Sequence, residues 1–156
     1  MPRSVRLRLA LTAVAACAVL AGPVAVAHAD DNALRVTLNS YVLKIQNEET
    51  AIKQGIKGYS QGKVKPLLRA LNAEIGTLHK LNFKLRQERA SSRVGRKAKK
   101  EIVEGFGLIA SAYVTLRNAV EAANGGPVPP SDVNAAVQTD KQGRTKLLKG
   151  LKLLGG

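Results

Sequence analysis

Tryptophan is absent from this sequence of 156 residues, and aromatic residues make up only 3% of it. The core of a β-sandwich draws on aromatic and β-branched side chains, so this composition argues against one. Hydrophobic residues still account for 45% of the chain, which is enough for a packed core. The interior must therefore consist of Leu, Ile, Val and Ala, as in helices that meet along aliphatic seams.

Cysteine is equally scarce, since Cys17 is the only one and it lies in an apolar N-terminal segment. Without that segment the chain has no thiol, so neither a disulfide nor a cysteine ligand is available. His79 is the one histidine beyond the segment, and it has no evident partner. The sequence also has no Gly-rich phosphate loop, no nucleophile elbow and no paired catalytic groups. We therefore predict no metal, no cofactor and no enzymatic activity.

The N-terminus has the order of a secretory signal. A basic stretch over residues 1–8 precedes an apolar run over residues 9–27, and Ala27-His28-Ala29 supplies the small residues of a cleavage site. We predict that residues 1–29 are a signal peptide cleaved after Ala29. Residues 30–156 then form a single domain of a secreted or extracytoplasmic protein from a bacterium.

Two alternatives remain at this end of the chain. An uncleaved membrane anchor is one, although Gly22-Pro23 would weaken a spanning helix. Acylation of Cys17 is the other, because Val14-Ala15-Ala16-Cys17 resembles a bacterial lipobox. The apolar residues after Cys17 disfavour it, since a lipoprotein normally continues with a polar tether.

Apolar residues recur at intervals of three and four, as in amphipathic helices. The pattern predicts one helix around residues 34–59, a second over 66–90, a third with its stripe over 102–123, and a fourth capped by Ser131 or Asp132. Polar residues or glycine interrupt the first and fourth stripes, at Glu48, Gly55, Asp140, Gly143 and Arg144. The stripe of the second helix comprises Leu68, Leu71, Ile75, Leu78 and Leu85, widened by Leu67 and Leu81.

These helices predict an all-α fold, because no single stripe is buried unless the helices pack together. Short connections favour antiparallel neighbours, so we expect an up-down-up-down bundle of four helices. The fourth stripe is the weakest of the four. A three-helix bundle with an amphipathic C-terminal tail is the alternative.

Acidic residues are outnumbered, and the net charge is +14. Loss of residues 1–29 removes three arginines and no acid, which leaves +11. Such an excess predicts attraction to polyanions such as anionic lipid, wall polymer or nucleic acid. Nucleic acid is the weaker candidate, because no aromatic residues are interleaved with the cations for base stacking.

The cations are densest at the turn between the second and third helices. Those that open the third helix oppose its dipole, which is unusual for charges that serve only solubility. Up-down-up-down topology places the C-terminal lysines at the same end of the bundle. Glu101 and Glu104 are expected to offset Lys97 and Lys100. The candidate anion-binding residues are Arg86, Arg89, Arg93, Arg96, Lys97, Lys99, Lys100, Lys146, Lys149 and Lys152.

The sequence therefore predicts a non-enzymatic secreted protein that binds an anionic component of the cell envelope through this cationic end. That component is a lipid head group, a wall polymer or an acidic protein. One alternative is a membrane-active protein that acts through its basic amphipathic C-terminal helix. An enzyme of unrecognised type is another, and ordinary solvated charge is the simplest explanation of the cations.

Overall fold

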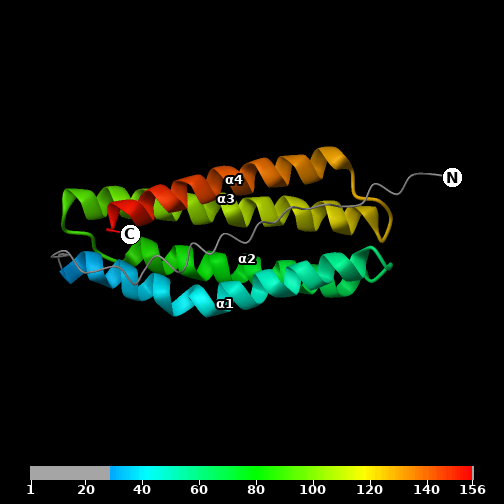
Figure 1. Ribbon diagram of the computed structural model, residues 1–156, viewed down its shortest axis with the longest axis horizontal. Coiled ribbons are helices and arrows are strands. Elements are labelled where there is room, and N and C mark those ends of the chain that lie inside the picture. The colour runs from blue at the N-terminus through cyan, green and yellow to red at the C-terminus, as the bar shows by residue number, and fades with distance from the viewer. Residues whose placement is uncertain (1–28, 156) are drawn as a thin grey trace.

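The computed structural model describes residues 29–155, which form four α-helices. They are α1 (Ala29–Tyr59), α2 (Val64–Gln87), α3 (Arg93–Ala123) and α4 (Pro130–Leu153). The helices run alternately in opposite directions along one long axis (Figure 1), and residues 29–155 contain no strand. The predicted four-helix up-down-up-down bundle is confirmed. The predicted signal peptide and Cys17 lie outside the described residues.

The helix ends follow the glycines and prolines of the sequence. Gly62 adopts a φ of 80° in the α1–α2 turn, and Asn124 ends α3 with a φ of 43° in the left-handed region. Two expectations about helix ends are wrong. α2 ends at Gln87 rather than near Ala90, because Glu88 is already extended. α4 begins at Pro130 without a side-chain cap from Ser131 or Asp132, since proline itself suits the first turn of a helix.

α3 and α4 form the most closely packed pair of helices. A Cβ atom added to Gly105 would lie 2.8 Å from the carbonyl oxygen of Gly143, and the reverse distance is also 2.8 Å. Glycine weakens an isolated helix, but here it lets two backbones approach. Leu151 and Leu154, further along α4, are also buried. The C-terminal segment is therefore a bundle helix and not a free tail, and a membrane-active role would require it to give up these contacts.

α2 presents the most deeply buried face in the bundle. The side chains on this face are each 1% exposed or less. The predicted stripe is therefore buried as expected except at Leu68, which is only half-buried, while Leu67 and Leu81 lie at the centre of the face and not at its edge. The face includes one carboxyl side chain among leucines. It comprises Leu67, Leu71, Glu74, Leu78, Leu81 and Leu85.

Candidate anion-binding site and a buried polar cluster

The start of α1, the α2–α3 turn and the end of α4 lie together at one end of the bundle (Figure 1). We call this end, with the ten candidate cations named above, the cationic pole. Most of these side chains are exposed. Within residues 31–155, eight of them have no carboxylate oxygen within 4.0 Å: Arg86, Arg89, Arg93, Arg96, Lys97, Lys99, Lys100 and Lys152.

Two of the C-terminal lysines are engaged within the protein. Lys146 donates to Glu104 at 2.5 Å, and Lys149 donates to Glu101 at 2.6 Å. These hydrogen bonds lower the pKa of both carboxyl groups. The expectation that Glu101 and Glu104 offset Lys97 and Lys100 holds only in part. The charge of Lys100 helps to lower the pKa of both carboxyl groups, but their ion-pair partners come from α4. The unpaired charge of the pole is concentrated at the α2–α3 turn instead.

Lys99 holds a special position at this turn. Its ammonium group donates to the carbonyl oxygens of Arg86 at 2.7 Å and Glu88 at 2.5 Å. These carbonyls belong to the C-terminal end of α2, which carries the negative end of the helix dipole. Lys99 therefore covers the carbonyls that would repel an anion.

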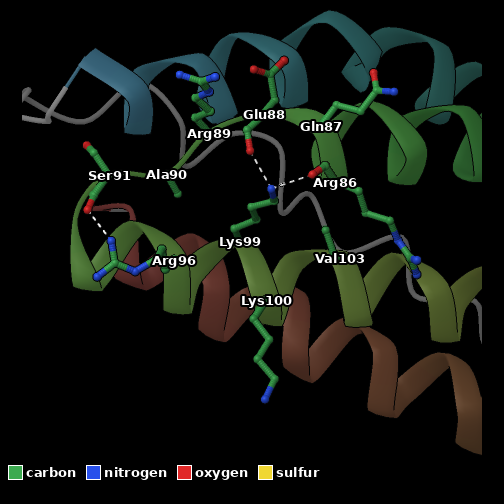
Figure 2. Close-up of a pocket in the computed structure, with 10 residues that line it drawn as sticks. All are labelled: Arg86, Gln87, Glu88, Arg89, Ala90, Ser91, Arg96, Lys99, Lys100 and Val103. Carbon is green, nitrogen blue, oxygen red and sulfur yellow. Dashed lines mark hydrogen bonds between the residues drawn. The ribbon is translucent and has the colours of Figure 1, made fainter.

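An open groove of about 760 Å³ runs along the turn. Figure 2 shows Lys99 in its middle, Arg86 extending toward Val103 at one end, and Arg96 donating to the carbonyl oxygen of Ser91 at the other. Five cations and one acid, Glu88, are among its lining residues. The full lining is Arg86, Gln87, Glu88, Arg89, Ala90, Ser91, Arg96, Lys99, Lys100 and Val103.

The N-terminus of α3 is occupied by the protein's own carboxylate. Ser92 Oγ accepts from the Gly95 amide at 2.7 Å and donates to Asp31 Oδ2 at 2.7 Å. Asp31 is only 8% exposed and lies so close to Gly95 that a Cβ atom at residue 95 would displace its carboxylate. α1 thus supplies the acid that the first turn of α3 lacks. This contact relieves part of the dipole mismatch noted in the sequence.

A second polar group lies inside the bundle, about midway along it, and draws on all four helices. We call it the buried polar cluster. Thr77 Oγ1 donates to Glu48 Oε1 at 2.8 Å. Arg144 bridges Asp140 on its own helix, at 2.8 Å, and Glu49 on α1, at 3.2 Å. The members are Glu48, Glu49, Glu74, Thr77, Tyr113, Asp140 and Arg144.

Glu74 is the most enclosed of these side chains, with 1% of it exposed. Burial, together with a hydrogen bond to the carboxyl group of Glu48, raises the pKa of Glu74 to about 9. Glu74 therefore holds a proton at neutral pH and can share it with Glu48. Burial also raises the pKa of Tyr113 above its ordinary value. In Arg144 burial opposes the charged form, but the hydrogen bond to Asp140 and the nearby acidic groups together outweigh it and raise the pKa.

The sequence prediction missed this cluster, although one signal was available. Residues 67, 71, 74, 78, 81 and 85 follow a strict alternation of three and four, which places Glu74 on the buried face. Within residues 29–155 no three His, Cys, Asp or Glu side chains are arranged to hold a metal ion. The burial of Glu74 also keeps substrates away from its carboxyl group in this conformation. The geometry is that of a structural polar core.

Comparison with protein families, with curated proteins and with solved structures finds no match for this chain. None of the helices within residues 29–155 is long and apolar enough to cross a membrane.

Proposed function

We propose that this protein is a secreted, non-enzymatic helical protein that binds an anionic component of the cell envelope through its cationic pole. The observation that carries the proposal is the groove at the α2–α3 turn. Arg86, Arg89 and Arg96 line it, they are exposed, and within residues 31–155 none has a carboxylate within 4.0 Å. Arginine suits such a role because its planar guanidinium group binds anionic oxygens in pairs.

The arrangement of the remaining charges supports the same conclusion. Acids are available elsewhere and form ion pairs, as Glu101 and Glu104 do with α4. The charges at the α2–α3 turn are left without such partners, and Lys99 suppresses the opposing helix dipole beneath them. A surface that serves only solubility requires neither feature, because solvated charges of mixed sign achieve it.

The test is binding of the purified protein to anionic vesicles and to wall fragments, with neutral vesicles as the blank. The pole variant changes Arg86, Arg89, Arg93 and Arg96 to Gln. Each cation near an anionic surface contributes about 1 kcal/mol, so the loss of four should weaken binding roughly a thousandfold at low salt. Binding of the unmodified protein should also fall steeply as salt is added.

A matched control changes four exposed lysines outside the pole to Gln, namely Lys44, Lys57, Lys63 and Lys65. Three of them lie at or beside the α1–α2 turn, at the opposite end of the bundle. The control has the same net charge as the pole variant and should bind nearly as well as the unmodified protein. Equal losses in the two variants would mean that bulk charge, and not the pole, is responsible. Absence of binding to every anionic surface at low salt would refute the proposal.

A further inference from the structure

The cations of the groove do not converge on one point. Figure 2 shows Arg86 and Arg96 pointing toward opposite ends of the groove and Arg89 pointing toward α1, with Lys99 between them. Along α3 the lining residues extend from Arg96 to Val103. Seven residues of helix correspond to about 10 Å at a rise of 1.5 Å per residue. A single compact anion at either end would leave the cations at the other end unused.

The two walls of the groove also constrain the chemistry of the anion. Arg86 comes from the last turn of α2, Arg89 follows it in the α2–α3 turn, and Arg96 comes from the beginning of α3. A carboxylate is planar and presents both oxygens on one edge, so a bidentate contact with one arginine uses both. The two free oxygens of a phosphodiester are tetrahedrally disposed and can accept from opposite walls. The groove lining contains no aromatic side chain on which a base could stack.

From these features we propose that the groove binds a linear phosphodiester polymer without bases, several consecutive phosphates at a time. The proposal rests on the proposed function and names the class of its ligand. Lys99 is a positioning residue in this site, because its ammonium group is already held by two backbone carbonyls. It sets the sign of the potential along the groove, while the arginines make the contacts.

The test measures the affinity of the purified protein for poly(glycerol phosphate) chains of increasing length, with glycerol phosphate as the monomer. The dissociation constant per chain should fall at least about tenfold between the monomer and a chain that fills the groove. Three arginine contacts predict a log–log salt slope of about −2, since each contact with a single chain contributes about −0.7. An affinity that rises with length only in proportion to the number of phosphates in the chain would overturn the proposal, because that is the result expected of a single-phosphate site.

Two variants separate phosphate recognition from charge. Arg86→Lys and Arg96→Lys retain the charge but remove the paired donors, so each should weaken polymer binding about threefold to tenfold. Arg69→Lys, at an exposed position on α2 outside the groove lining, is the control and should change nothing. If the Arg86 and Arg96 variants bind as tightly as the unmodified protein, the forked contacts do not exist and the proposal fails.

Competing polyanions complete the experiment. Polyglutamate of equal charge should bind at least about tenfold more weakly, and equal binding would show that the groove does not distinguish phosphate from carboxylate. Tighter binding of oligo-dT would point to nucleic acid. Binding to phosphatidylglycerol vesicles alone would point to a membrane surface. Each of these three results overturns the polymer proposal, and the carboxylate and vesicle results leave the proposed function standing. Failure of every anion, vesicles included, removes both.

Discussion

Glu74 is the residue whose environment departs furthest from what its type prefers. A carboxyl side chain is rarely enclosed to 1% exposure without a paired charge. In Glu74 a bound proton neutralises the carboxyl group, so no countercharge is needed. Burial and a hydrogen bond with the carboxyl group of Glu48 raise its pKa to about 9. One oxygen of Glu74, Oε2, is buried and has no partner within the described residues. Deprotonation would therefore leave a charge with little compensation.

The first prediction concerns the pH dependence that follows. Because the pKa of Glu74 is higher in the folded state than in the unfolded chain, its stabilising proton is fully effective below about pH 4.5 and is lost as the pH rises to about 9. Between these values the free energy of unfolding should fall as the pH rises on account of this group, by on the order of 1 kcal/mol per pH unit. Glu74→Gln keeps a neutral side chain and should remove this dependence. Urea unfolding of both proteins across the range measures it.

Glu121→Gln is the control, since Glu121 is exposed on α3. Its unfolding curves should follow those of the unmodified protein at every pH. The Glu74→Gln variant should instead become progressively more stable relative to the unmodified protein as the pH rises. Parallel curves for Glu74→Gln and the unmodified protein would show that Glu74 ionises at an ordinary pKa.

From the sequence, several residues of the buried polar cluster were recognised only as polar interruptions of an apolar stripe. Glu48, Asp140 and Arg144 were visible as interruptions, but their common location was not. It depends on how α1 and α4 are rotated about their axes and on their register along the bundle. Those quantities are determined by contacts between helices, such as Arg144 with Glu49, and no local pattern contains them.

At the scale of the helices, prediction was more successful, because periodicity and turn residues are local properties. Four helices were expected and four are present, with α1 and α3 each spanning 31 residues. The C-terminal helix was the uncertain one, since Asp140 and Arg144 interrupt its stripe and Gly143 reduces its helix propensity. Gly150, further along the helix, reduces it as well. Their effect is the reverse in the bundle, where both glycines face α3 at close range. Intrinsic propensity could not show this, because it describes an isolated helix.

The second prediction tests this contact with two glycine substitutions. Gly105→Ala places a Cβ 2.8 Å from backbone atoms of Gly143 and Leu147, which cannot move without separating α3 from α4. It should lower the free energy of unfolding by about 1–3 kcal/mol. Gly76→Ala, on α2, meets nothing within 4 Å and should raise it by about 0.5–1 kcal/mol. Chemical denaturation compares the two. A Gly105→Ala variant that is also stabilised would mean that α4 does not pack on α3 as described.

Over the whole molecule, the distribution of charge is more informative than its sum. The net charge was evident from composition, and the topology correctly predicted which turns share an end. Composition could not show which cations already have a hydrogen-bonding or ion-pair partner within the protein. Lys146 and Lys149 are paired and Lys99 covers the end of α2, whereas the arginines at the turn are left without carboxylate partners among residues 31–155. These differences arise only when α4 is placed beside α3 and the turn is folded.

The last prediction concerns the cations at the start of α3 and their effect on the free energy of unfolding. α3 begins with Arg93, and its first turn contains no acid of its own. Cations at this position oppose the helix dipole by about 0.3–1 kcal/mol each, which the contact of Asp31 with Ser92 only partly offsets. Changing Arg93, Arg96 and Lys97 to Gln should therefore raise the free energy of unfolding by about 1–2 kcal/mol at about 0.01 M salt. At about 1 M salt, where screening acts over about 3 Å, the gain should largely vanish. Urea unfolding at the two salt concentrations measures it.

A variant that gains stability while losing affinity for anions would show that these cations are retained for binding at the expense of the fold. A variant of unchanged or lower stability at low salt would show that they serve the fold or its solubility instead.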